Sequence, residues 1–127
     1  MKDYSIAGIG EVLWDLFPEY KRLGGGTANF AYHVSQFGFD AAVASALGHD
    51  PLGDEVVRTL EDNKVGYLLP QVDFPTGTVQ VEVNSDGVPR YDIREQVAWD
   101  HIPYTDSLRE LARNCCAVCL GSVSLRI

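Results

Sequence analysis

Residues 23–31 read Leu-Gly-Gly-Gly-Thr-Ala-Asn-Phe-Ala, a glycine run that passes directly into apolar residues at helical spacing. This pattern predicts a helix that begins near Thr27, whose side chain can cap it, and that ends at Gly38. Glycines at a helix start let a ligand approach the backbone, and the amides there can donate to ligand oxygens. Asn29 lies one turn in, with both donor and acceptor capacity. The alternative is an ordinary strand-to-helix turn with Asn29 on the surface.

On both sides of this helix, predicted strands and helices alternate. Strands are expected at 4–10, 41–47, 65–69 and 117–120, and further helices at 50–63 and 105–113. Asp50 followed by Pro51 is typical of a capped helix start. Such alternation favours an α/β fold, in which helices cover a parallel sheet.

A predicted antiparallel hairpin interrupts the alternation. Its first strand carries Val79, Val81 and Val83 on one face and polar residues on the other. Asn84-Ser85-Asp86-Gly87 is typical of a hairpin turn, and residues 89–94 form the expected partner strand. We expect this hairpin to be half-exposed and to project as a flap.

The composition excludes several classes of protein. The chain has 127 residues, of which 46% are hydrophobic, so it can bury a core and is not broadly disordered. Its formal charge is −8, and its basic residues are scattered, which argues against nucleic-acid binding and against an anionic membrane partner. The longest apolar run, Cys115–Leu120, is too short to span a bilayer, and the N-terminus lacks a signal-peptide pattern. We therefore expect a cytoplasmic protein.

The cysteines Cys115, Cys116 and Cys119 all fall in one apolar stretch. We expect a buried strand with reduced thiols that act as small hydrophobic side chains. A zinc site would need a further ligand pair, and the three histidines are scattered, so no metal site is predicted.

Two further segments bear on ligand binding. The run Gly8-Ile9-Gly10 begins like a dinucleotide fingerprint, but Leu13 stands where the third glycine belongs and no helix follows. Asp15 lies in an apolar stretch close to the glycine run, where its carboxylate could accept hydrogen bonds from vicinal hydroxyls of a sugar. The alternative is an exposed loop aspartate.

In combination, these segments resemble the N-terminal half of the ribokinase-like (PfkB) carbohydrate kinases. The resemblance covers essentially the whole chain. The matching segments are Gly10–Asp15, Gly24–Ala31, Leu47–Asp54, Thr76-Gly77, Val97–Asp100 and Gly121-Ser122. The last two of these segments are similar to the fructokinase branch of the family.

The resemblance implies a ribokinase-like three-layer α/β/α body, with a Rossmann-like parallel sheet and a small β-sheet lid. Residues 1–127 would be the N-terminal part of one kinase domain, truncated after the strand at 117–120, which would leave an apolar face uncovered. The lid elements are expected at about 11–20 and 74–98, and the lid would also join two copies as a homodimer.

The same resemblance implies a sugar site. Asp15 would accept from sugar hydroxyls, and it is the only carboxylate that the sequence suggests there. The sugar would lie against the glycine run 24–26, that is Gly24, Gly25 and Gly26, and Asn29 would contact a hydroxyl. Arg94 matches a substrate-contacting arginine of related kinases.

The implied reaction is transfer of the γ-phosphoryl group of ATP, with Mg²⁺, to a sugar hydroxyl. The catalytic base and the ATP site of the family lie in a C-terminal glycine-rich segment that residues 1–127 do not contain. No catalytic, cofactor-binding or metal residue is therefore expected in this chain, which alone should be inactive. The alternatives are a fragment of a nucleoside kinase and a non-catalytic α/β module that binds a sugar or nucleoside.

Overall fold

The main sheet is parallel and four-stranded, as the alternation predicts. A computed structural model describes residues 3–126; Met1, Lys2 and Ile127 lie outside the described residues. The strand order is β10-β1-β4-β6, with every neighbouring pair parallel. The bounds of these strands are β1 Ile6–Ile9, β4 Ala41–Ala44, β6 Gly66–Leu68 and β10 Ala117–Leu120.

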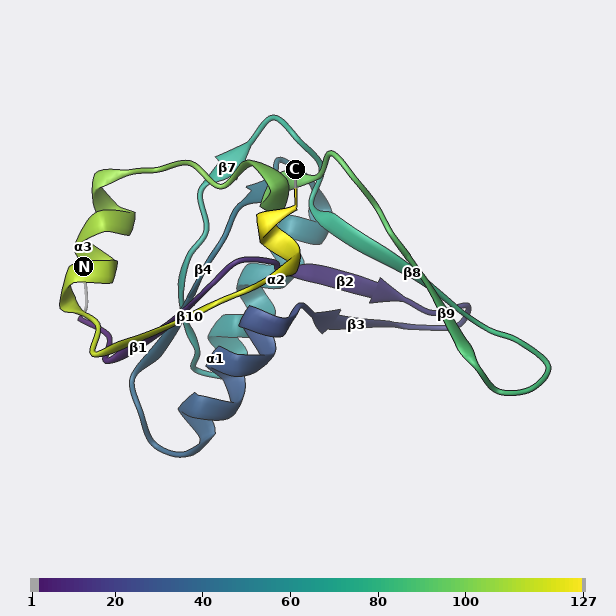
Figure 1. Cartoon of the computed structure of the whole chain (residues 1–127), viewed down its shortest axis with the longest axis horizontal. Helices are drawn as coiled ribbons and strands as arrows, with labels where there is room; N and C mark the ends of the chain where they lie inside the picture. The colour runs from purple at the N-terminus through teal and green to yellow at the C-terminus, as the bar shows by residue number, and fades with distance from the viewer. Residues whose placement is uncertain (1–2, 127) are drawn as a thin grey trace.

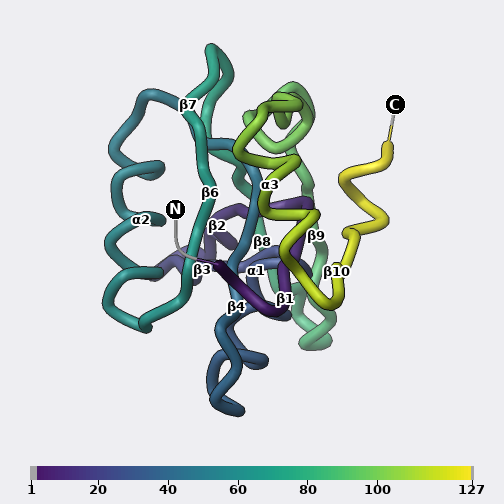
Figure 2. The backbone as a smooth tube through the Cα atoms, turned by 90° about the vertical axis from the view of Figure 1, so that its left-hand side faces the viewer, coloured from purple at the N-terminus to yellow at the C-terminus, as the bar shows by residue number. Residues whose placement is uncertain are grey.

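Helices cover both faces of this sheet (Figure 1). Helices α1 (Gly26–Gln36) and α2 (Pro51–Asp62) pack with Val43 of β4 on one face. Helix α3 (Asp106–Asn114) packs through Leu111 on Ala42 and Ala44, the alternate residues of the same strand. Figure 2 shows α2 and α3 on opposite sides of the strands. The body therefore has the expected three layers.

A second, mixed sheet projects from the body (Figure 1). Its order is β3-β2-β8-β9, with β2 parallel to β8 and the other two pairs antiparallel. The bounds are β2 Leu13–Leu16, β3 Lys21–Gly24, β8 Gly77–Val83 and β9 Pro89–Ile93. Segments far apart in the sequence, 13–24 and 77–93, thus form one sheet, and both overlap the ranges expected for a lid.

Short elements complete the chain. The strand expected at 41–47 breaks into β4 and β5 (Leu47–Gly48), and β5 pairs with β7 (Gln71–Val72) in a two-stranded sheet. Two single 3₁₀ turns, η1 (Ala98–His101) and η2 (Val123–Leu125), follow the mixed sheet and β10. No helix within residues 3–126 is long and apolar enough to cross a membrane.

The two predicted helix starts have different outcomes. Asp50 caps α2 as expected, since its side chain accepts a hydrogen bond from the Gly53 N–H at 2.8 Å. The predicted capping role of Thr27 is wrong: α1 begins one residue earlier, with Gly25 at the N-cap position. The Thr27 side chain is buried and its hydroxyl donates to the main-chain oxygen of Glu11 at 2.8 Å, so it cannot serve the helix end.

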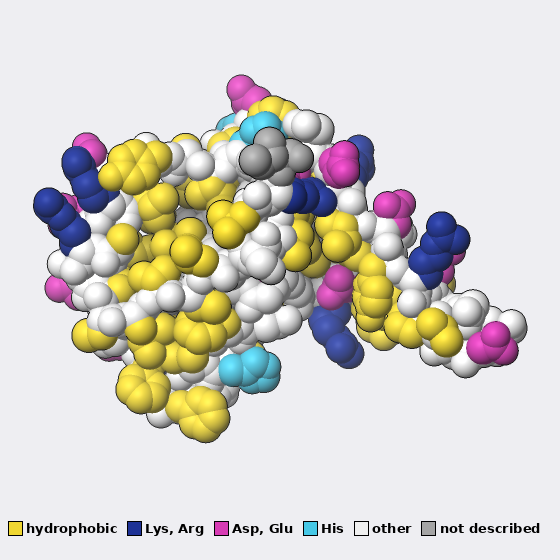
Figure 3. Space-filling view, viewed as in Figure 1, with side chains coloured by type: hydrophobic (Ala, Val, Ile, Leu, Met, Phe, Trp, Pro, Cys, Tyr) yellow, Lys and Arg dark blue, Asp and Glu magenta, His cyan; other side chains and the backbone are white. Residues whose placement is uncertain are grey.

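The predicted burial of the last strand is also wrong. β10 forms an edge of the main sheet, Leu120 is 63% exposed, and Cys116 is exposed while Cys115 and Cys119 are half-buried. Figure 3 shows hydrophobic side chains gathered on this face of the body. The apolar sequence predicted a strand here correctly. Its burial, however, needs a further strand or helix beside β10, and residues 3–126 do not supply one.

The valine face of the hairpin is only partly buried. Val79 and Val81 pack with Val97 and Trp99, whereas Val83 is 58% exposed because it lies near the projecting tip. The turn and the partner strand form as predicted, with Val83 paired to Pro89.

Candidate functional site

The glycine turn before α1 approaches the end of β1 more closely than any side chain would allow. Gly25 has a φ of 102°, and a Cβ there would collide with the main-chain carbonyl of Glu11. Both observations require glycine at this position. The turn therefore packs its main chain directly against Glu11, where the main sheet leads into the mixed sheet.

Asp15 lies beside this turn, on strand β2. Its neighbour across the β2–β3 pair is Arg22, and a Cβ on Gly24 would lie only 2.6 Å from the Asp15 Oδ2. Burial raises the pKa of Asp15 above its ordinary value, and the positive charge of Arg22 partly offsets this effect. Asp15 is thus a half-buried carboxylate held against the glycine run.

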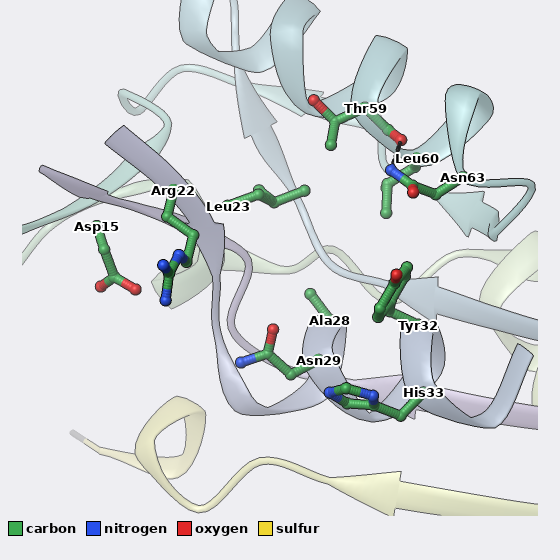
Figure 4. A pocket seen from close by; sticks show the side chains of 10 residues that line it. All are labelled: Asp15, Arg22, Leu23, Ala28, Asn29, Tyr32, His33, Thr59, Leu60 and Asn63. Atoms are coloured by element: carbon green, nitrogen blue, oxygen red, sulfur yellow. Dashed lines mark hydrogen bonds between the residues drawn. The ribbon is translucent and has the colours of Figure 1, made fainter. Parts of the chain in front are cut away.

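Asp15 lines two hollows of the surface. The larger, about 570 Å³, also contains Arg22 and Asn29 and lies between β3 and the helices α1 and α2 (Figure 4). In Figure 4 the side chains of Asp15 and Arg22 extend in the same direction from neighbouring strands, and Asn29 faces them from the first turn of α1. This end of the hollow is therefore rich in hydrogen-bonding groups.

The smaller hollow, about 190 Å³, shares Asp15 with the larger one. It is floored by the glycine turn and walled by the mixed sheet. Its lining comprises Glu11, Leu13, Asp15, Gly25, Gly26, Val79, Tyr91, Ile93 and Val123. Asp15 lines both hollows, which makes Asp15 the centre of the candidate site.

The structure brings most of the expected site residues together, but not Arg94. Asp15 lines both hollows, Asn29 lines the larger, and Gly25 and Gly26 line the smaller. Gly24 is buried beside the Asp15 carboxylate and lines neither. Arg94 lines a separate hollow with Thr78, Gln80 and Asp92, and its carbonyl accepts a hydrogen bond from the Arg126 guanidinium at 2.8 Å. Neither hollow at Asp15 includes Arg94.

Sequence reasoning missed Glu11, a second carboxylate that lines the smaller hollow with Asp15. Glu11 is 6% exposed, and its Oε1 accepts a hydrogen bond from the Gly26 N–H at 3.1 Å. Its position directly after Gly10, at the end of a predicted strand, is the signal that could have drawn attention to it. Within residues 3–126 no group of three or more His, Cys, Asp or Glu side chains could hold a metal ion.

Comparison with known proteins places the chain in a family. The profile of the pfkB family carbohydrate kinases matches residues 19–94, which include the glycine turn, α1 and the hairpin. The chain belongs to the pfkB family of carbohydrate kinases. This confirms the resemblance that the sequence motifs indicated.

Two curated relatives have similar sequences. One is an ATP-dependent 6-phosphofructokinase of Thermoanaerobacterium thermosaccharolyticum, 28% identical over 125 residues, which cover 89% of this chain and 38% of the relative. The other is a sugar kinase of Pyrococcus horikoshii, 28% identical, with 94% of this chain and 43% of the relative covered. The pfkB chain described here thus spans about two fifths of the length of the curated relatives it matches.

Solved structures support the ribokinase-like fold. The Pyrococcus horikoshii sugar kinase, solved in complex with ATP, superposes with a TM-score of 0.83 at 27% identity over 94% of this chain and 44% of that one. A fructokinase of Halothermothrix orenii superposes with a TM-score of 0.77 at 21% identity over 91% and 45% of the two chains. The latter identity supports the fold alone.

Proposed function

We propose that this pfkB chain supplies the sugar-binding half of a fructokinase-like, ATP-dependent carbohydrate kinase. The observation that carries the proposal is the convergence of Asp15, the Gly24–Gly26 run and Asn29 where the mixed sheet meets α1. A carboxylate, the main chain of a glycine turn and an amide side chain together suit a ligand with several hydroxyl groups.

Each group would have a distinct part in binding. Asp15 accepts hydrogen bonds from sugar hydroxyls, and Asn29 can both donate and accept. Gly25 and Gly26 line the smaller hollow, where the main chain of the turn can contact a sugar. These contacts fix the orientation of the hydroxyl that receives the phosphoryl group.

The remaining parts of the reaction come from outside residues 1–127 in this proposal. The base that removes the hydroxyl proton and the groups that bind Mg²⁺ and ATP belong to a further segment. The mixed sheet would act as the lid, and its closure would exclude water, which otherwise competes as the phosphoryl acceptor.

The fructokinase-like assignment rests on the segments Val97–Asp100 and Gly121-Ser122, and the first of them packs under the mixed sheet. Trp99 is buried against Val79 and Val81, and Asp100 forms a salt bridge with Arg126 at 3.0 Å. The segment therefore supports the mixed sheet from inside the body, and it would act on sugar choice through the position of that sheet.

We further propose that the mixed sheet mediates a homodimer. Tyr91 and Ile93 are exposed, and they pair across the hairpin with Val81 and Val79, so their side chains share a face of the sheet with those valines. An exposed apolar sheet face of this kind gains stability from a second apolar surface.

The test uses the product of the complete reading frame that encodes this chain. ADP release is measured with fructose, fructose 6-phosphate, ribose and adenosine in turn, in the presence of ATP and Mg²⁺. Sugar-dependent turnover supports a carbohydrate kinase, and preference for fructose supports the fructokinase-like assignment. Turnover with adenosine alone would favour a nucleoside kinase, and binding without turnover would favour a non-catalytic module.

A further inference from the structure

Glu11 is a buried carboxylate to which the proposed function gives no part. It follows β1, which lies between β10 and β4 in the main sheet. The chain leaves the sheet at this point to form β2, and the carboxyl ends of neighbouring parallel strands are where α/β proteins bind ligands. Glu11 also lines the smaller hollow together with Gly25 and Gly26.

The side chain and the main-chain carbonyl of Glu11 both accept hydrogen bonds from residues at the start of α1. Its side-chain Oε1 accepts from the Gly26 N–H at 3.1 Å, and its main-chain oxygen accepts from the Thr27 hydroxyl at 2.8 Å. Helix α1 has no acidic residue in its own first turn and no side-chain cap. Glu11 therefore supplies, from another segment, the negative charge and the acceptor that a helix start favours.

The second carboxylate oxygen of Glu11 is an anomaly. Oε2 is fully buried and has no hydrogen-bond partner within residues 3–126. It packs against Gly121, at the end of β10, so closely that a Cβ there would collide with it. A buried carboxylate oxygen without a partner destabilises a fold, so an apolar side chain of similar length would be the more stable choice for packing alone.

We propose that Glu11 is a positioning residue of the sugar site, which holds the glycine turn in place through the Gly26 N–H. The carboxylate lies between the glycine turn and Gly121, and so fixes the turn relative to the ends of both β1 and β10. A turn of three glycines has no side chains that could hold its own conformation, so it needs a contact from another segment. We infer that the benefit of this contact to function outweighs the unfavourable burial of the unpaired Oε2. This inference rests on the proposed function, since it assigns the turn to sugar binding.

Two variants separate this role from simple packing, again in the product of the complete reading frame. Glu11→Met keeps the length of the side chain but removes the acceptor, whereas Glu11→Gln keeps an oxygen that can accept from the Gly26 N–H. Glu110→Met, at an exposed position of α3, is the matched control. KM for sugar, KM for ATP and the melting temperature are measured for each.

Glu11→Met should raise the KM for sugar about tenfold or more, leave the KM for ATP within about threefold, and leave the melting temperature unchanged or higher. Glu11→Gln should restore the KM for sugar to within about threefold of the wild type, since its oxygen replaces the lost acceptor. Three results would overturn the proposal: an unchanged KM for sugar in Glu11→Met, equal losses for sugar and ATP with a lower melting temperature, or a Glu11→Gln variant as impaired as Glu11→Met.

A wild-type protein that phosphorylates none of the tested sugars would refute the proposed function and, with it, the assignment of the turn to sugar binding; the contact between Glu11 and the turn would remain to be decided. The positioning role is then decided by hydrogen exchange of the Gly26 amide, which needs no activity. That amide should exchange about tenfold faster in Glu11→Met than in Glu11→Gln. Equal rates would show that the carboxylate does not hold the turn.

Discussion

Asp50 and Thr76 are joined by two hydrogen bonds that connect the start of α2 to the base of β8. The Thr76 hydroxyl donates to the Asp50 Oδ1 at 2.6 Å, and the Thr76 N–H donates to Oδ2 at 2.9 Å. The same carboxylate caps α2, and the Thr76 hydroxyl accepts from the Gly48 N–H at 3.0 Å. One aspartate therefore fixes a helix of the body and the first residue before the mixed sheet.

Asp50→Asn should destabilise the fold by about 1–3 kcal/mol at neutral pH, because it leaves buried donors without a charged acceptor. Unfolding is measured by urea titration. Asp73→Asn, at an exposed position nearby, is the control and should change little.

The effect of Asp50→Asn should depend on pH. Burial alone would raise the pKa of Asp50, but hydrogen bonds from Thr76 and Gly53 outweigh it and hold the pKa below the ordinary value of 3.8. A lowered folded-state pKa stabilises the protein above pH 3.8, and this stabilisation is lost as the pH falls through the folded-state pKa. The difference between wild type and variant should therefore shrink below pH 3.8, and a constant difference would contradict this account.

Asp15→Asn should separate stability from function. Loss of a charge-assisted hydrogen bond should raise the KM for sugar about 10–100-fold, with little effect on the KM for ATP. Because burial raises the pKa of Asp15, its ionised form is disfavoured in the folded state, and the variant should be at least as stable at pH 7. Any gain in stability should disappear below the ordinary pKa of 3.8, where both folded and unfolded Asp15 become protonated.

The control is Asp92→Asn, at an exposed position of the same sheet. Unchanged sugar kinetics in Asp15→Asn would show that Asp15 is not part of the sugar site.

The hairpin β8–β9 should be protected by a partner copy or by sugar. We expect its amides to exchange more slowly when sugar is added, or the protein to be a dimer that Tyr91→Glu weakens. Exchange is followed by mass spectrometry and the oligomeric state by light scattering. A monomer whose hairpin exchanges equally with and without sugar would refute the role of this sheet as a lid.

Residues 1–127 alone should show no sugar kinase activity. Phosphoryl transfer needs a base within hydrogen-bond reach of the attacking hydroxyl and positive partial charge around the transferred group. Asp15 has a binding role in the proposal, and Glu11 is buried against Gly26 and Gly121. A coupled ADP assay on the purified chain with fructose, ribose and adenosine checks this, and turnover well above a blank without enzyme would reveal a base among these residues.

The same chain should self-associate through the exposed edge of the main sheet. β10 is an edge strand whose Val118 and Leu120 are exposed on one face, and unpaired edge strands with apolar residues pair with other chains. Leu120→Lys should reduce association in light scattering. Tyr104→Lys, which alters an exposed aromatic residue before α3, should not reduce association. If both variants reduce association equally, exposed apolar side chains in general cause it, and the edge strand β10 has no special part.

The sequence by itself determined the order and type of the main elements. Apolar periodicity placed β1, α1, α2 and α3 to within a few residues, Asp50-Pro51 marked the start of α2, and the turn at 84–87 marked the hairpin. These features depend on residues close together in the chain, so local patterns carry them. The glycine run, Asp15 and Asn29 were likewise visible as motifs.

Only the tertiary structure decided which segments become neighbours and which side chains are buried. It paired β2 with β8 across more than sixty residues, left β10 exposed, and placed Arg94 away from Asp15. It also turned the Thr27 hydroxyl toward Glu11 and buried Glu11 between Gly26 and Gly121. Burial and hydrogen-bond partners depend on segments that are distant in sequence, and no local pattern records the register in which they meet.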